Sequence, residues 1–298
     1  MFENIKGNEE NKKILSKIIN EKKIGHSYMF VGQTGIGKML FAKEFAKAVL
    51  CLQEKQCNNC KSCLEFANNN NPDITIIEKE EDSNVIKIDQ IRQMTSKILE
   101  KPIISNKKVY IINDSELMTE AAQNSLLKTL EEPPEYATII LITSREDLFL
   151  NTIKSRCTKI MFNKLSNEDL KQILKIKYNY ENISNNMFLL FDGSVERALN
   201  LIDKEKEYEE LSNIINNLEK YNVVDVLNLK EKMFKQKEEA RGTLDYINLL
   251  FYNLVKKDIR YANCMKAAEK AKEKLTKNNN YDMTIDNFLL TIWEELND

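Results

Sequence analysis

Two spacings of apolar residues follow one another along the 298-residue chain. In the first half, short apolar runs at 28–31, 109–112 and 138–143 are separated by stretches whose apolar residues recur every three or four positions. Short runs are typical of buried strands, and the wider spacing is typical of amphipathic helices. Because strands that alternate with helices form mostly parallel sheets, the first half predicts an α/β fold.

The ends of the predicted elements carry their own signals. The remaining elements of the first half are helices at 14–19, 40–50, 88–92 and 120–130 and a strand at 73–77. Asp89 is the predicted N-cap of one helix. Pro133 and Pro134 close another, since proline cannot continue a helix. From Ser166 onward the pattern is helical throughout, with Gly193-Ser194 as the main interruption, so an all-α second half is expected.

A glycine-rich loop joins the strand at 28–31 to the helix that follows it. Its sequence is Gly32-Gln33-Thr34-Gly35-Ile36-Gly37-Lys38-Met39. The GxxxxGK spacing lets backbone N–H groups surround a phosphate and lets Lys38 reach its outer oxygens. The sequence therefore predicts a nucleotide site that includes Gly32, Gly35, Gly37, Lys38 and Met39, and the alternative is a tight glycine turn.

The residues that should hold Mg²⁺ are missing. Met39 stands where a Ser or Thr hydroxyl is expected, and a thioether is a poor ligand for a hard cation. After the strand at 109–112, Asn113 replaces the metal-binding Asp and Asp114 stands at the position of the water-orienting Glu. The site is predicted to be degenerate for hydrolysis, and the sequence leaves ATP or ADP binding open.

Four cysteines lie within thirteen residues, at Cys51, Cys57, Cys60 and Cys63. Two CxxC spacings within a group of four match a tetrahedral zinc site. A disulfide is a weak alternative in the cytosol, and a redox CxxC motif does not need four cysteines. We expect a structural Zn²⁺ knuckle inserted after the helix of the glycine-rich loop.

Charge and hydropathy restrict the class of protein. The net charge of −2 argues against a general polyanion-binding protein. Residues 256–277 nevertheless form a basic helix, for which a solvated face is favoured over DNA-phosphate contact. No apolar run has the length of a membrane span and Met1–Asn4 does not begin a signal peptide, so a cytoplasmic location is expected. The single histidine, His26, is expected to be packed or capping rather than a ligand or base.

Five segments occur in a characteristic order. They are residues 2–8, 24–32, the cysteine group 51–63, the LEEPP-containing segment 122–134 and Ser155-Arg156-Cys157. Together they resemble the AAA+ clamp-loader family of bacterial DNA polymerase III, and the likeness covers the first 200 residues well.

The resemblance implies a domain plan and a set of partners. It implies an AAA+ P-loop domain at 1–163 with a zinc knuckle at 51–63, a helical lid at 164–205 and a helical collar at 206–298. Five subunits of such a family form an open ring that loads the sliding clamp onto primed DNA. The implied partners are gamma/tau and delta subunits, through the collar and AAA+ faces, and the clamp and DNA through the assembled complex.

The resemblance also gives Arg156 a role. In this family the SRC arginine enters the ATP site of a neighbouring subunit as an arginine finger, and without the flanking motifs a helix-terminal surface arginine would be the simpler interpretation. Hydrolysing members carry an arginine shortly after the lid's Gly-Ser, where this chain has Glu196 and then Arg197. The likeness is therefore to a non-hydrolysing subunit, while DNA-directed DNA polymerase activity resides in other subunits. The alternatives are an active gamma/tau-type ATPase and a zinc-dependent nucleic-acid-binding protein.

Overall fold

The computed structural model describes residues 1–277 and 279–297, which form two compact units. The first unit comprises Met1–Asn182 and Asp192–Arg197. The second comprises Ile183–Phe191 and Ala198–Asp298. Each unit is described by itself.

A five-stranded sheet forms the centre of the first unit. Its strands are β1 (Ser27–Val31), β2 (Ile74–Ile77), β3 (Lys108–Ile112), β4 (Ala137–Thr143) and β5 (Thr158–Met161). The order across the sheet is β2-β3-β4-β1-β5, and every neighbouring pair is parallel. The predicted parallel sheet is confirmed.

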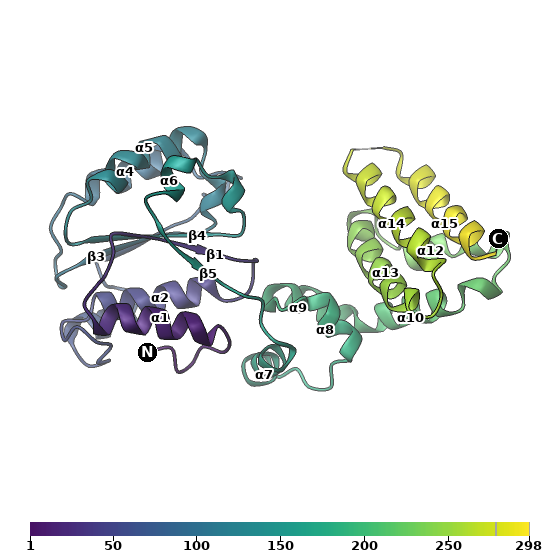
Figure 1. Cartoon of the computed structure of the whole chain (residues 1–298), viewed down its shortest axis with the longest axis horizontal. Coiled ribbons are helices and arrows are strands. Elements are labelled where there is room, and N and C mark those ends of the chain that lie inside the picture. Colours follow the sequence, from purple (N-terminus) through teal and green to yellow (C-terminus); the bar gives the residue numbers. More distant parts are fainter. Residues whose placement is uncertain (278, 298) are drawn as a thin grey trace. The chain divides into compact units, whose positions relative to one another are not determined.

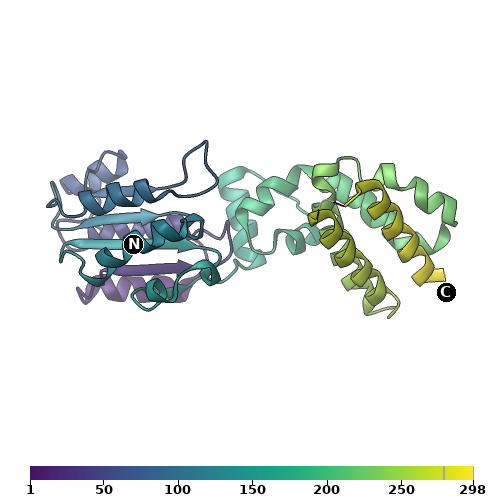
Figure 2. The same cartoon turned by 90° about the horizontal axis from the view of Figure 1, so that it is seen from above.

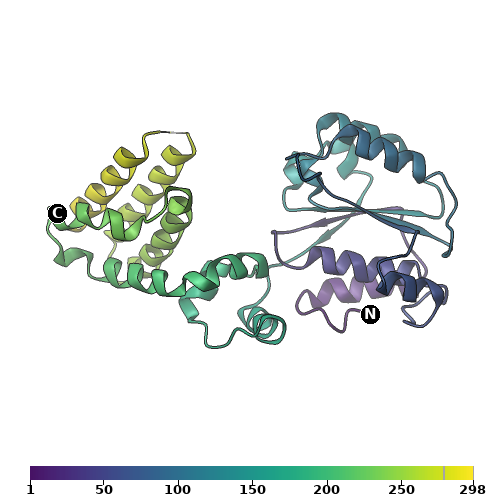
Figure 3. The same cartoon turned by 180° about the vertical axis from the view of Figure 1, so that it is seen from behind.

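Helices cover both faces of this sheet. The α-helices that lie wholly in the first unit are α1 (Glu9–Asn20), α2 (Lys38–Val49), α3 (Lys61–Ala67), α4 (Ile88–Lys97), α5 (Glu120–Glu131), α6 (Asn151–Lys154) and α7 (Asn167–Tyr178). Helices α1 and α2 lie on one face and α4 and α5 on the other (Figures 1 and 3). Tyr28 and Phe30 of β1 join the core on the α1–α2 side, whereas Met29 and Val31 join the core on the α4–α5 side. Burial of both strand faces explains why β1 is a continuous apolar run without alternation.

The helix ends confirm one expectation and correct another. Helix α5 starts after Thr119, whose side chain accepts a hydrogen bond from the Ala122 N–H, and it ends before the two prolines as predicted. Asp89 is not the N-cap of α4. That position belongs to Lys87, whose backbone N–H donates to Gln90 Oε1 at 3.0 Å, so the Gln90 side chain caps the helix and Asp89 lies in its first turn. Outside the helices, His26 was expected to be packed or capping, and its exposure contradicts the packed interpretation.

The second unit is helical, as predicted. Its α-helices are α8 (Asn185–Phe191), α10 (Glu205–Asn216), α11 (Val223–Asn228), α12 (Lys230–Met233), α13 (Ala240–Val255), α14 (Tyr261–Thr276) and α15 (Tyr281–Asn297), and α9 (Val195–Leu201) crosses the boundary between the units. Helices α14 and α15 lie side by side (Figure 2), and residues such as Phe251, Cys264 and Phe288 are buried. None of the described helices is both long and apolar enough to cross a membrane.

Candidate functional site

The glycine-rich loop lies between the carboxyl end of β1 and the start of α2. Gly32 N–H donates to Thr143 O of β4 at 3.1 Å, which fixes the start of the loop to the sheet. Gly37 has φ +96° and directly precedes α2. A left-handed φ is readily available to glycine, so this turn depends on the glycine that the GK motif supplies. The structure thus places the strand, loop and helix in the expected order.

Lys38 is folded back onto its own loop. Its Nζ donates to Gly32 O at 2.7 Å and to Gln33 O at 2.8 Å, and the residue is only 7% exposed. Burial lowers the pKa of Lys38, and the nearby charges of Glu116 and Asp114 oppose that effect. The ammonium group that should reach a phosphate is occupied by backbone carbonyls in this structure.

The start of α9 packs directly against the loop. Val195 N–H donates to Gly35 O at 2.9 Å. A Cβ on Gly35 would clash with Ser194 Oγ and would lie 2.6 Å from the Glu196 Cβ. The absence of a side chain at Gly35 therefore permits this close approach, which places Glu196 beside the loop.

Acidic groups also lie near Lys38. Asp114 follows β3, and desolvation together with Glu116 raises the pKa of its carboxyl group. Glu116 Oε1 accepts hydrogen bonds from the backbone and side chain of Ser144, at 3.0 and 2.5 Å. Carboxylates near a phosphate site repel the polyanion. Glu116 was not among the predicted site residues because it follows the Asn113-Asp114 position by two residues, and only the fold brings it near Lys38.

The two substituted metal positions make other contacts. The Asn113 side-chain amide donates to Glu78 Oε1 at 3.2 Å and to Asp114 Oδ2 at 3.3 Å. Met39 is partly buried and packs against the core between the sheet and α1–α2. In these positions neither the packed thioether nor the donating amide group presents a strong ligand for Mg²⁺.

The four cysteines come together in the connection between α2 and β2. Helix α2 ends at Val49, as predicted, and Cys60 directly precedes α3, which contains Cys63. The four Sγ atoms of Cys51, Cys57, Cys60 and Cys63 all lie within 4.8 Å of one another. Three Sγ–Sγ separations are 3.5, 3.9 and 4.0 Å. Thiolates about 2.3 Å from a tetrahedral zinc ion would be separated by about 3.8 Å. The donor set and its spacing therefore fit a metal ion of this kind.

Arg156 lies at the amino end of the strands, and the glycine-rich loop lies at their carboxyl end. Its backbone carbonyl accepts a hydrogen bond from Ser27 Oγ at 2.6 Å, and Ser27 is the first residue of β1. The loop follows Val31, the last residue of β1. Four residue steps of strand are about 13 Å long at about 3.3 Å per residue. The structure does not bring Arg156 to the loop of its own chain.

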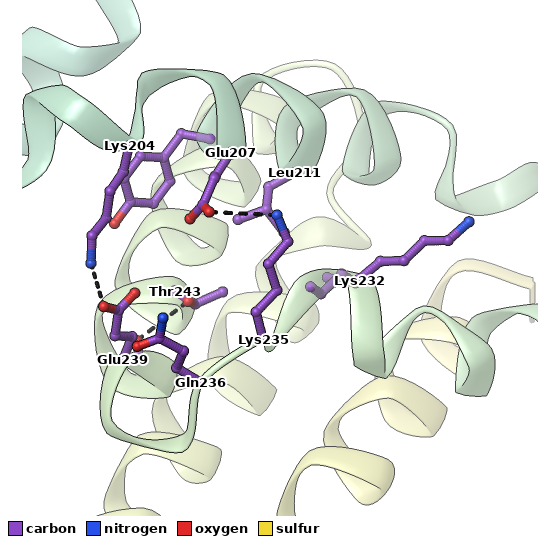
Figure 4. Close-up of a pocket in the computed structure, with 10 residues that line it drawn as sticks. Lys204, Glu207, Leu211, Lys232, Lys235, Gln236, Glu239 and Thr243 are labelled. Atoms are coloured by element: carbon purple, nitrogen blue, oxygen red, sulfur yellow. Dashed lines mark hydrogen bonds and ion pairs between the residues drawn. The ribbon is translucent and has the colours of Figure 1, made fainter.

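Basic side chains in the second unit are mostly neutralised where they line a pocket. Figure 4 shows Lys204 paired with Glu239 at 2.6 Å and Lys235 near Glu207 at 3.5 Å, while Lys232 points away from the other labelled side chains. In α14, Lys272 pairs with Asp245 and Glu269, each at 2.7 Å. These ion pairs neutralise Lys204, Lys235 and Lys272.

Comparison with known proteins identifies the family. The family model described as "DNA polymerase III, delta subunit" matches residues 7–166, which is more than half of the chain. The chain belongs to this family. Among curated relatives, DNA polymerase III subunit gamma/tau of Mycoplasma genitalium is 33% identical over 236 residues, covering 75% of this chain and 39% of the relative. DNA polymerase III subunit delta' of Bacillus subtilis is 36% identical over 155 residues, covering 51% of this chain and 46% of the relative.

The relatives support the clamp-loader family of DNA polymerase III as a whole. This chain spans less than half of the length of the two relatives above. A solved structure of a DNA polymerase III gamma-subunit-related protein from Thermotoga maritima is 20% identical, with a TM-score of 0.48 over 95% of this chain and 99% of that one. The family resemblance seen in the motifs is confirmed, and membership alone does not choose between gamma/tau-type and delta'-type subunits.

Proposed function

We propose that this chain is a non-hydrolysing, delta-prime-type subunit of a bacterial DNA polymerase III clamp loader. In this role it helps to assemble the ring that loads the sliding clamp onto primed DNA. Its own AAA+ P-loop domain supplies no ATPase activity. Instead, Arg156 acts in trans as an arginine finger in the ATP site of a neighbouring subunit.

The observation that carries the proposal is the placement of Arg156 relative to the glycine-rich loop. An arginine at the amino end of β1 cannot serve a phosphate site at the carboxyl end of the same strand. A second chain could present its nucleotide to that arginine. A guanidinium brought in trans stabilises the charge that develops during phosphoryl transfer.

The state of the loop supports the non-hydrolysing half of the proposal. Lys38 is engaged by two carbonyls, and Glu196 stands beside Gly35. Neither Met39 nor Asn113 offers a good Mg²⁺ ligand. Mg²⁺ neutralises much of the charge in phosphoryl transfer. Without a well-held Mg²⁺ ion, this loop would hydrolyse ATP poorly.

We also propose that the Cys51–Cys63 segment holds one structural Zn²⁺. Four cysteines satisfy a closed tetrahedral site, which leaves no position for a substrate or a catalytic water. The ion would tie the α2–α3 connection together and contribute to local folding. The remaining proposals are the domain division at 1–163, 164–205 and 206–298, assembly with gamma/tau and delta subunits, and a cytoplasmic location.

Two observations favour a second candidate, an active gamma/tau-type ATPase. The gamma/tau relative of M. genitalium aligns with 75% of this chain, whereas the delta' relative of B. subtilis aligns with 51%. The intact GK pair at Gly37-Lys38 also belongs to working sites. The lost metal ligands weigh against this candidate.

Reconstitution tests the proposed function. The chain is mixed with gamma/tau-type and delta subunits from the same cell, and assembly, ATP hydrolysis and clamp loading are followed with and without it. We expect the chain to co-elute with the other subunits and clamp loading to require it. A chain that stays outside the complex, or that hydrolyses ATP by itself at the rate of the complex, would contradict the proposal.

A further inference from the structure

The guanidinium of Arg156 is held by its own chain. Nη2 donates to Glu131 Oε1 at 2.7 Å, and Nη1 donates to Thr152 O at 2.8 Å and to Ser155 Oγ at 3.4 Å. Glu131 is the last residue of α5, and Thr152 lies in α6. Two helices therefore fix the direction of one long side chain.

Local sequence explains why a carboxylate stands at this point. Helix α5 begins at the Thr119 cap and cannot pass Pro133-Pro134, so its last residue is fixed at Glu131. Helices α5 and α6 pack against each other, which brings the end of one beside the arginine that follows the other. The contact is thus built into the packing of two elements and joins residues 25 positions apart.

We propose that Glu131 is a positioning residue for Arg156. The proposal rests on the proposed function, in which Arg156 reaches the ATP site of a neighbouring subunit. An unrestrained arginine must lose the freedom of several rotatable bonds when it binds a phosphate. By holding Nη2, Glu131 orders the side chain before the neighbour arrives, and part of that entropy loss has then already occurred.

The ion pair with Glu131 also leaves Arg156 free to bind a phosphate. The Arg156 side chain remains 33% exposed and the Glu131 side chain 48% exposed. A guanidinium has five N–H donors, and the three contacts above are made by Nη1 and Nη2, so donors remain for a phosphate. Because solvent screens a half-exposed pair, the carboxylate contributes little to stability and competes weakly with a phosphate.

A matched control is present in the next residue. Glu132 carries the same charge and is exposed, and among the described residues its side chain forms no ion pair. Glu131→Gln removes the charge beside Arg156, whereas Glu132→Gln removes an equal charge one position away. Both changes keep the size of the side chain and leave Pro133-Pro134 in place.

The test uses the full chain in the reconstituted clamp loader with sliding clamp and primed DNA. Glu131→Gln, Glu132→Gln, Arg156→Ala and the Glu131→Gln/Arg156→Ala double variant are compared for assembly and for kcat and KM of ATP hydrolysis. We expect Glu131→Gln to lower kcat by about twofold, the order expected for a half-exposed ion pair, with KM and assembly unchanged. Glu132→Gln should match wild type, and the double variant should match Arg156→Ala alone.

The possible outcomes separate the two proposals. If Arg156→Ala lowers kcat but Glu131→Gln matches Glu132→Gln, the positioning role is wrong and the trans arginine stands. A rise in kcat for Glu131→Gln, or a further loss in the double variant, also overturns the positioning role. If Arg156→Ala itself has no effect, the proposed function fails and the role of Glu131 fails with it.

Discussion

Lys38 is expected to act as a structural cation in this chain, and Lys38→Ala should therefore lower stability. The side chain is almost fully buried and donates to Gly32 O at 2.7 Å and Gln33 O at 2.8 Å. Each hydrogen bond from a charged group contributes about 1.5–3 kcal/mol. The cost of burying the ammonium group offsets part of that sum. We expect a net loss of about 1–3 kcal/mol in the free energy of unfolding of the first unit.

The pH dependence of this loss follows from the lowered pKa of Lys38. Its ordinary value is 10.5 and burial depresses the folded value. Between the folded pKa and 10.5 the unfolded chain binds more protons than the folded chain, so the contribution of Lys38 to stability rises with pH. The difference in unfolding free energy between wild type and Lys38→Ala should therefore widen as pH rises through this window.

The assay must report on the first unit. The only tryptophan, Trp293, lies in the second unit, so its fluorescence is unsuitable. Hydrogen–deuterium exchange of peptides from residues 27–49 measures opening of β1, the loop and α2 directly. Lys47→Ala is the matched control, because Lys47 lies on the same helix and, among the described residues, its side chain forms no ion pair. Equal protection in the two variants would refute the structural role of Lys38.

Three further predictions concern the same unit. Protein purified without chelator should contain about one zinc per chain, and Cys60→Ser should lower that content and loosen residues 51–67; a reduced, folded and metal-free protein would contradict the zinc site. The isolated chain should show no ATP turnover above background, and turnover that Lys38→Ala abolishes would reverse this conclusion. Gly35→Ala should speed exchange in residues 192–197 more than Gly37→Ala does, because both glycines have positive φ but only Gly35 contacts α9. Equal effects would show that backbone strain alone is responsible.

The apolar runs were sufficient to predict four of the five strands. β1, β3 and β4 are buried on both faces, and that burial requires a continuous apolar run. Strand β5 was missed because Thr158 and Lys159 leave it without an apolar run, whereas β2, the other edge strand, has the mostly apolar sequence Ile74–Ile77.

The candidate site was only partly predictable for a related reason. The GxxxxGK loop and the cysteine group consist of neighbours in the sequence, so their spacing carries the geometry. Other contacts of the site cannot be read from spacing. The contact of Lys38 with the loop carbonyls depends on the side-chain rotamer. The contacts of Gly35 with α9 and of Arg156 with Glu131 join segments that are far apart in the sequence. These contacts arise when the helices pack on the sheet. The local periodicity of a single sequence does not reveal that packing.

The most direct test of the central claim compares Arg156→Ala with Lys38→Ala in the reconstituted clamp loader. Arginine fingers contribute roughly 10³–10⁵ to the rate of a single NTPase site, and the loss for the whole complex should be smaller because other sites remain. Arg156→Ala should leave assembly intact and lower clamp-dependent ATP hydrolysis substantially. Arg156→Lys should restore little, because an ammonium group cannot make the planar two-pronged contact. Lys38→Ala should be much milder at a temperature where the variant remains folded. If Lys38→Ala is instead the more damaging change, the chain uses its own nucleotide site and the proposed function is contradicted.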